Sequence, residues 1–240
     1  YAAGSHYAHK GAASNFICLP EEPQWGDRTA AGYLAYAFGT EYESNMFGEN
    51  AHQQDVPCSV CQAKTGSVFT RWGRNDCTKT STLVYKGYAG GSHYSHKGAT
   101  LNFLCLPENP QWGDRKATKD LAFVYGTEYE STLFGGNAHQ QDVPCSVCQV
   151  EKGSFSIMIP ARTACYTGWT MQYKGYLGAG YHNHNAATEY ICVDENIQLL
   201  PGGIENKDGK LIYPVVSKCG SLRCHPYIDN KPLTCIVCSK

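Results

Sequence analysis

Three Cys-x-x-Cys pairs are the strongest chemical signal in the sequence. They are Cys58/Cys61, Cys145/Cys148 and Cys235/Cys238. A redox pair of the thioredoxin type needs its first cysteine at a helix N-terminus, where amide dipoles stabilise a thiolate. Cys61 is followed by glycine, serine and β-branched residues rather than by an amphipathic helix. The pattern therefore argues against redox catalysis.

A zinc site is the second interpretation of these cysteines. The middle of the chain has four of them, Cys77, Cys105, Cys145 and Cys148, which is enough for one tetrahedral ion. Structural sites of this kind usually combine two Cys-x-x-Cys pairs, whereas Cys77 and Cys105 stand 28 residues apart. The last part of the chain has six cysteines. The spacing fits zinc only in part.

Disulfides are the interpretation that we favour. On an extended strand, residues i and i+3 point to opposite faces and lie about 10 Å apart, too far for one bridge. Each cysteine of a pair must then find its own partner upstream. The simplest nested arrangement gives Cys18–Cys58, Cys77–Cys148, Cys105–Cys145, Cys165–Cys238 and Cys192–Cys235, with Cys219–Cys224 as a local loop. A loop of about forty residues closed in this way contributes on the order of 4 kcal/mol.

Cys61 is the odd cysteine of the thirteen. Its partner is expected in a segment upstream of Tyr1, and the alternative is a free or intermolecular thiol.

Histidines and aspartates form candidate metal sites. The residues are His6, His9, His52 and Asp55, repeated 87 residues later as His93, His96, His139 and Asp142, and a further pair is His182 and His184. Imidazole and carboxylate groups on loops bind divalent metals, and histidines also respond to pH near neutrality. The competing interpretation is that these are loop residues that bond to the backbone.

A second candidate set combines aromatic and charged side chains that could stack on sugar rings. It comprises Trp25, Asp27 and Arg28, repeated as Trp112, Asp114 and Arg115, with Tyr42 and Tyr129 nearby. A shallow site present in several copies would gain avidity from weak single contacts. The competing interpretation places these residues in the core and rim of a β-domain.

No catalytic motif is present. The sequence has no G-x-S-x-G, no H-E-x-x-H and no phosphate-binding glycine loop, so we expect no enzyme and no resident cofactor other than the divalent metal considered above. The net charge of −1 leaves no basic stripe for nucleic acid, and no apolar run reaches the length of a membrane-spanning helix.

An internal duplication organises the chain. Residues 1–62 align with 88–149 at a constant shift of 87, and by direct count 46 of the 62 positions are identical. A third, more divergent copy repeats Tyr85–Tyr88 as Tyr173–Tyr176 and ends in Cys235–Cys238. We therefore expect three units, at 1–62, 69–149 and 155–240. The first lacks about twenty residues that open the second, so we expect the natural chain to extend upstream.

Composition predicts strands and turns around these cysteines. The chain has 25 glycines and 11 prolines, and tyrosine dominates its aromatic residues. Strands are expected at 82–88, 102–106, 121–125, 154–159, 170–176, 189–193 and 211–216. A hairpin turn is expected at 206–210, which contains Asp-Gly, and helical turns only at 27–36 and 116–123. The fold class is mostly β, as a disulfide-rich tandem repeat.

The compartment follows from the thirteen cysteines. A chain of this length can be stabilised by its hydrophobic core alone, so core size does not explain the number of cysteines. Oxidising compartments convert such cysteines into a disulfide framework. We expect a secreted, extracellular protein.

The residues that carry this framework resemble a known family. The runs Leu83–Tyr88, Phe103–Leu106, Val143–Cys148, Met158–Arg162 and Cys235–Cys238 resemble the non-collagenous C-terminal domain of short-chain, spongin-type collagens, which is similar to the C4 repeat of collagen IV. The resemblance implies an extracellular, β-rich, disulfide-bonded module of matrix assembly. The chain departs from it in having no Gly-X-Y tract, in having three units instead of two, and in having the Cys219–Cys224 loop in one unit only.

These observations predict a non-enzymatic structural or assembly protein of an extracellular matrix, fibre or adhesive material. Its expected partners are other copies of itself, other matrix proteins or glycans. The alternative is a secreted multivalent lectin.

Overall fold

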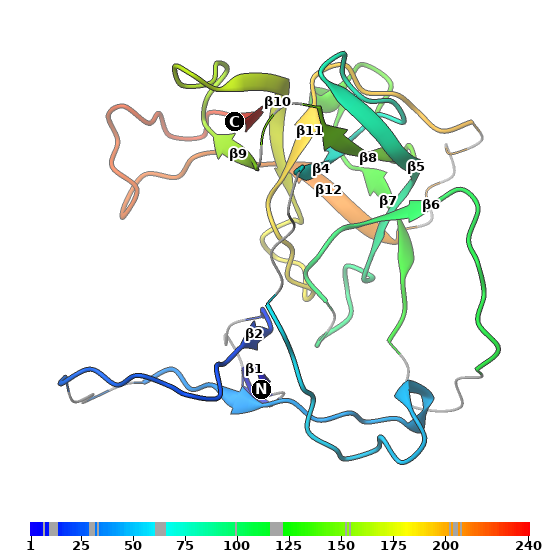
Figure 1. The fold of residues 1–240 in the computed structure, drawn as a ribbon. Helices are drawn as coiled ribbons and strands as arrows, with labels where there is room; N and C mark the ends of the chain where they lie inside the picture. Colours follow the sequence, from blue (N-terminus) through cyan, green and yellow to red (C-terminus); the bar gives the residue numbers. More distant parts are fainter. Residues whose placement is uncertain are drawn as a thin grey trace. The chain divides into compact units, whose positions relative to one another are not determined.

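The fold is described by a computed structural model. It describes residues 1–6, 8–9, 14–28, 32, 34–60, 66–98, 100–115, 122–151, 153, 155–201, 203, 206 and 208–240. Strands account for 37% of the chain and helices for 3% (Figure 1). The mostly β fold class is confirmed.

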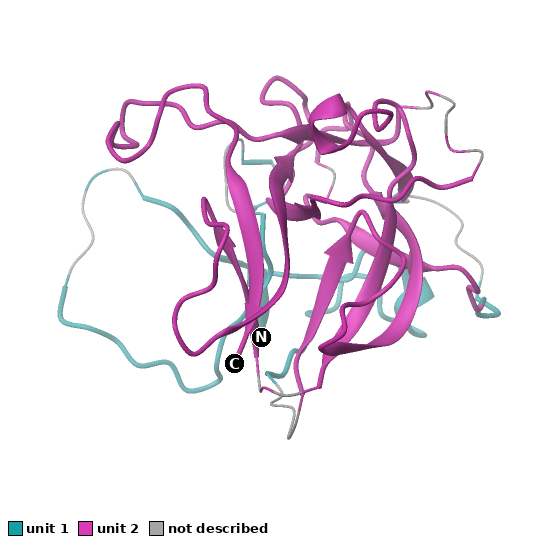
Figure 2. Ribbon diagram, turned by 90° about the horizontal axis from the view of Figure 1, so that it is seen from above, with its two compact units in different colours: residues 1–63, 112–122 teal, residues 64–111, 123–240 magenta. Residues whose placement is uncertain are grey.

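The chain forms two compact bodies (Figure 2). The first body comprises Tyr1–Ala63 and Trp112–Ala122, and the second comprises Lys64–Gln111 and Phe123–Lys240. The expected units 69–149 and 155–240 therefore lie in one body, except for the segment that belongs to the first. Each body is described separately below.

The first body contains a small antiparallel sheet. Strand β1 (Ala2–Gly4) lies between β2 (Ile17–Cys18) and β3 (Phe38–Gly39), and a 3-10 turn, η1 (Asn45–Phe47), follows. Ser44 begins this turn, because its hydroxyl accepts a hydrogen bond from the Met46 amide.

The second body contains two sets of five strands with the same internal pairing. The first set is β4 (Val68–Trp72), β5 (Ser81–Gly91), β6 (Leu104–Pro107), β7 (Tyr125–Tyr129) and β8 (Pro144–Val150). The second set is β9 (Ser156–Pro160), β10 (Thr170–Ala179), β11 (Ile191–Asp194), β12 (Lys210–Pro214) and β13 (Thr234–Ser239). In the first set β8 pairs with β4 and β5, and β5 also pairs with β6 and β7. In the second set β13 pairs with β9 and β10, and β10 also pairs with β11 and β12.

The first body has the same register as part of the first set. Ala2 pairs with Cys18 as Ala89 pairs with Cys105, and Gly4 pairs with Phe38 as Gly91 pairs with Tyr125. The turn η1 corresponds in the same way to η2 (Thr132–Phe134). Strand pairing thus follows the shift of 87 found in the sequence.

Two parallel contacts join the two strand sets into one closed ring. Strand β7 pairs with β12, and β4 pairs with β11, while β11 also pairs with β10. Because both sets contribute edges to the ring, they share a core: Trp72 and Phe103 from the first set pack in one cluster with Val193 and Ile212 from the second.

Most predicted strands in the second body are confirmed with small shifts in their bounds, one is displaced, and the expected hairpin and helical turns are not found among the described residues. The strand expected at 121–125 begins only at Tyr125 and runs to Tyr129, because its β12 partner lies beside Thr127–Tyr129. In the part of 206–210 that the structure describes, no hairpin is seen, and β12 pairs with β7 and β10 instead. The described residues of 27–36 and 116–123 contain no helix. Residues 29–31, 33, 116–121, 154 and 207 lie outside the described residues.

Candidate assembly interface

Six disulfides join the described cysteines in the arrangement expected from the sequence. They are Cys18–Cys58, Cys77–Cys148, Cys105–Cys145, Cys165–Cys238, Cys192–Cys235 and Cys219–Cys224. Cys145 and Cys148 both lie on β8 and bond to different partners, as the i, i+3 geometry of a strand requires. These sulfurs hold no zinc site and no free redox pair. Cys61 lies outside the described residues. A framework of this density is typical of oxidising compartments.

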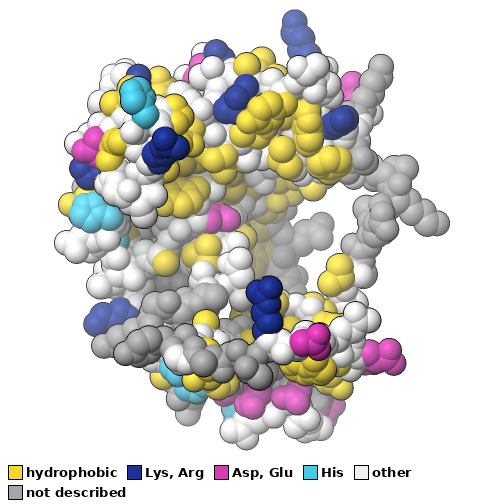
Figure 3. Space-filling model, turned by 90° about the vertical axis from the view of Figure 1, so that its left-hand side faces the viewer, with side chains coloured by type: hydrophobic (Ala, Val, Ile, Leu, Met, Phe, Trp, Pro, Cys, Tyr) yellow, Lys and Arg dark blue, Asp and Glu magenta, His cyan; other side chains and the backbone are white. Residues whose placement is uncertain are grey.

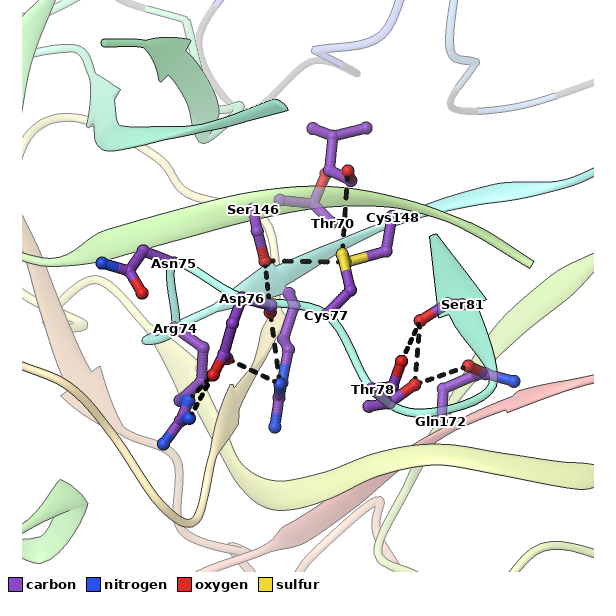
Figure 4. Close-up of a disulfide and its surroundings, with 12 residues drawn as sticks. Thr70, Arg74, Asn75, Asp76, Cys77, Thr78, Ser81, Ser146, Cys148 and Gln172 are labelled. Atoms are coloured by element: carbon purple, nitrogen blue, oxygen red, sulfur yellow. Dashed lines mark hydrogen bonds and ion pairs between the residues drawn. A yellow bond between two sulfur atoms is a disulfide. The ribbon is translucent and has the colours of Figure 1, made fainter. Parts of the chain in front are cut away.

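Ionic and polar side chains surround the Cys77–Cys148 bridge (Figure 4). Ser146 Oγ donates to the Asp76 carbonyl at 2.8 Å, and Arg74 Nε donates to the Asp76 carboxylate at 2.9 Å. The guanidinium of Arg74 lowers the pKa of Asp76, chiefly through this hydrogen bonding. The loop that carries Cys77 is thereby fixed against β8.

Arg71 extends this network from one strand set to the other. Its Nη1 contacts Asp76 Oδ1 at 2.9 Å, and its Nη2 contacts Asp194 Oδ2 at 2.8 Å. The Asp194 side chain is 2% exposed. A carboxylate this deeply buried needs a charged partner, so Arg71 joins β4 to β11 electrostatically where they also pair as strands.

Lys210 is the main polar anchor of the β7–β12 contact. The residue is fully buried, and its Nζ lies 3.2 Å from Ser92 Oγ and 3.3 Å from the Ala187 carbonyl. The ammonium also lies 5.1 Å from the centre of the Phe103 ring. Burial lowers the pKa of Lys210 to about 8. Lys210 thus adds polar and cation–π contacts to the packing of the two strand sets.

Backbone hydrogen bonds continue the contact on both sides of Lys210. The Glu130 amide donates to the Ile212 carbonyl at 2.8 Å, and the Tyr94 amide donates to the Gly209 carbonyl at 3.1 Å. The Phe103 amide donates to Glu189 Oε1 at 2.7 Å. The second strand set is thus held to the first along the second half of β7 and beside it. This contact between the two strand sets is the candidate assembly interface.

The candidate metal ligands are not assembled into metal sites. The His6 and His9 rings lie 5.0 Å apart against Phe38, and the His93 and His96 rings lie 4.9 Å apart against Tyr125. The His52 ring nitrogen lies 3.9 Å from the Glu43 carboxylate, and that of His139 lies 3.8 Å from the Glu130 carboxylate. Asp55 and Asp142 form β-bridges through their backbones with Glu41 and Glu128. The His182 and His184 rings pack on Tyr181. Among the described residues, none of the predicted ligands belongs to a group of three close ligand atoms.

The group that does form is one that the sequence did not indicate. Oxygens of Glu128, Glu130 and Asp208 lie within 4.8 Å of one another. Burial is the main cause that raises the pKa of Glu130, and the other two carboxylates raise it further. Asp208 lies just before β12, far along the chain from the two glutamates, so no sequence spacing connects it with them.

The candidate sugar-binding residues are at the surface. Trp25 is 87% exposed and Trp112 is 88% exposed, and their neighbours Asp27, Arg28, Asp114 and Arg115 are exposed too. These tryptophans are therefore not core residues. Tyr129, by contrast, is completely buried and packs beside Phe134. Arg115 donates to the Met46 carbonyl at 2.8 Å.

Both basic and acidic side chains are present on the face drawn in Figure 3, and apolar side chains gather in patches between them. Among the described residues, no helix is both long and apolar enough to cross a membrane. No known protein-family model matches the chain.

Proposed function

We propose that this protein is a secreted, non-enzymatic structural component that assembles into an extracellular matrix, fibre or adhesive material. We also propose that it is a tandem array of three C4-like units, at 1–62, 69–149 and 155–240, of the kind found at the ends of short-chain collagens. Its partners would be further copies of itself or other matrix proteins.

The observation that carries the proposal is the contact between the second and third copies. Strand β12 adds to the edge of β7 in parallel, and Lys210 is buried among acceptors and the Phe103 ring. Units that bury a strand of their neighbour are suited to assembly rather than to turnover of a substrate. The six disulfides support extracellular use, because such bridges persist under oxidising conditions.

The test is self-association of the oxidised full chain. We expect sedimentation velocity to show larger species as the protein concentration rises, and electron microscopy to show filaments or networks. A chain that stays monomeric at every concentration and in the presence of matrix extracts would contradict the proposal.

A second candidate function is glycan binding by a secreted multivalent lectin. It is favoured by the two tryptophans Trp25 and Trp112, which are almost fully exposed at equivalent positions of the repeat. Exposed tryptophans beside charged side chains stack on sugar rings. Haemagglutination reversed by a simple sugar, and lost in the Trp25→Ala/Trp112→Ala variant, would favour this function. Retention of binding by the double variant would exclude these tryptophans as the site.

A further inference from the structure

The first body has an open pocket of about 840 Å³ beside the edge of β3. Its lining includes Ser5, Phe16, Thr40, Glu41 and Asp55. Every lining residue belongs to the first copy, and the pocket lies within one body. Its position is therefore independent of how the two bodies are arranged.

The same surface in the second copy is occupied by the third copy. At the shift of 87, Ser5 corresponds to Ser92, Phe16 to Phe103 and Thr40 to Thr127. Ser92 contacts the Lys210 ammonium, Phe103 lies beneath it, and Thr127 pairs with Lys210 in the sheet. The carboxyl end of the surface corresponds as well, since the Asp142 amide, the equivalent of Asp55, donates to the Gly203 carbonyl at 2.9 Å.

Exposure differs between the two copies in the way that a missing partner predicts. Phe103 is 5% exposed under the third copy, whereas Phe16 is 78% exposed. Phe134 is 2% exposed and its equivalent Phe47 is 65% exposed. Identical residues thus form a core in the second copy, where Lys210 and Trp72 both pack on Phe103, and an apolar surface in the first.

The lengths of the equivalent strands β3 and β7 also differ as a missing partner predicts. Strand β7 runs over Tyr125–Tyr129 because β12 pairs with its second half, whereas the equivalent β3 ends at Gly39. Beyond Gly39, the Thr40 amide donates to the Ala2 carbonyl, and the Val56 amide donates to the Thr40 carbonyl. In the second copy the Val143 amide donates to the Thr127 carbonyl in the same way. The edge is therefore in place to receive a strand.

The acidic lining of the pocket indicates which kind of strand would bind there. Glu41, Glu43 and Asp55 line it together with His6, and its described lining includes no lysine or arginine. A cationic side chain suits this lining, and Ser5 and Phe16 repeat the Ser92 and Phe103 contacts of Lys210.

We propose that this pocket binds an extended strand of another polypeptide that carries a lysine followed by aliphatic residues, in the manner of Lys210–Ile212. The chain's own Lys210 strand already pairs with the second copy, so the occupant that we propose is a strand of a separate molecule. This inference rests on the proposed assembly function and identifies the chemistry of the partner.

The test uses the oxidised full chain and a fluorescent peptide with the sequence of Asp208–Pro214. Fluorescence anisotropy should show saturable binding. Affinity should fall at least tenfold with the Phe16→Ala protein, and equally when the peptide carries methionine in place of Lys210. The matched control is Leu34→Ala, because Leu34 is 46% exposed in the same body but does not line the pocket. This variant should bind the peptide like the unaltered chain.

Two results would overturn the inference. One is the absence of saturable binding up to the solubility limit of the peptide. The other is binding that Phe16→Ala leaves unchanged, which would place the peptide elsewhere. The methionine peptide guards against misfolding, because it leaves the protein unaltered. Failure of the assembly function is read separately, from sedimentation of the chain without peptide.

Discussion

Gly87 lies where two strands of the second body approach too closely for any side chain. A Cβ atom built on Gly87 would lie 1.7 Å from the carbonyl oxygen of Leu106 on β6. The equivalent Gly175 has the same environment, since its Cβ would lie 1.8 Å from the carbonyl oxygen of Val193 on β11. Both contacts are with backbone, so no side-chain rotation can relieve them.

We predict that Gly87→Ala strongly destabilises the second body. A normal carbon–oxygen contact needs about 3.2 Å, so β6 would have to move by roughly 1.5 Å from β5. The two strands pair at Gly87–Pro107, Tyr88–Leu106, Ala89–Cys105 and Gly90–Leu104. With about 1 kcal/mol for each ladder hydrogen bond, loss of this pairing costs on the order of 3–4 kcal/mol.

Denaturant unfolding monitored by fluorescence provides the measurement, because Trp72 is 8% exposed in the core of the second body. Gly126→Ala is the matched control. Gly126 is also a strand glycine, but a Cβ built there meets nothing within 4 Å. We expect the control to change the unfolding free energy by less than about 0.5 kcal/mol. If Gly87→Ala and Gly126→Ala had the same stability, the close approach of β6 would be refuted.

Three further predictions concern the contacts between copies. Burial lowers the pKa of Lys210 to about 8, so above this pH the unfolded chain binds more protons than the folded chain. The free energy of unfolding should therefore rise as the pH increases from about 8 toward 10. Urea unfolding at several pH values should show this rise in the unaltered chain and not in Lys210→Met. Arg71→Ala leaves the buried Asp194 carboxylate without its guanidinium and should cost about 3–5 kcal/mol, whereas exchange of both residues for apolar ones should cost less. Phe103→Ala should lower the free energy of unfolding by about 3–5 kcal/mol, because Phe103 is buried. The equivalent Phe16→Ala should change the midpoint of thermal unfolding little, because Phe16 is exposed. Equal effects of the two substitutions would contradict this difference in burial.

The sequence predicted the disulfides because strand geometry left few choices. Cys145 and Cys148 cannot share a bridge on one strand, and the duplication supplied the same constraint in each copy. The β class followed from the abundance of tyrosine, glycine and β-branched residues. These are local signals, and they need no knowledge of which strands meet.

The contacts between the two strand sets were missed because they are not local. Nothing in the residues around Lys210 indicates that this lysine is buried against Ser92, which lies 118 residues away. The same holds for Asp208 beside Glu128 and for Arg71 beside Asp194. The extent of β7 was mispredicted for this reason too: a partner from another copy defines where that strand ends.

The long bridges have a mechanical consequence for the structural role that we propose. Cys77–Cys148 and Cys165–Cys238 connect residues 71 and 73 positions apart, and Cys18–Cys58 connects residues 40 positions apart. Tension applied at the two ends passes through sulfur and bypasses the chain inside each loop. Under oxidising conditions a pulled molecule would lengthen only by its short linkers, whereas a reductant would release most of its contour length at once.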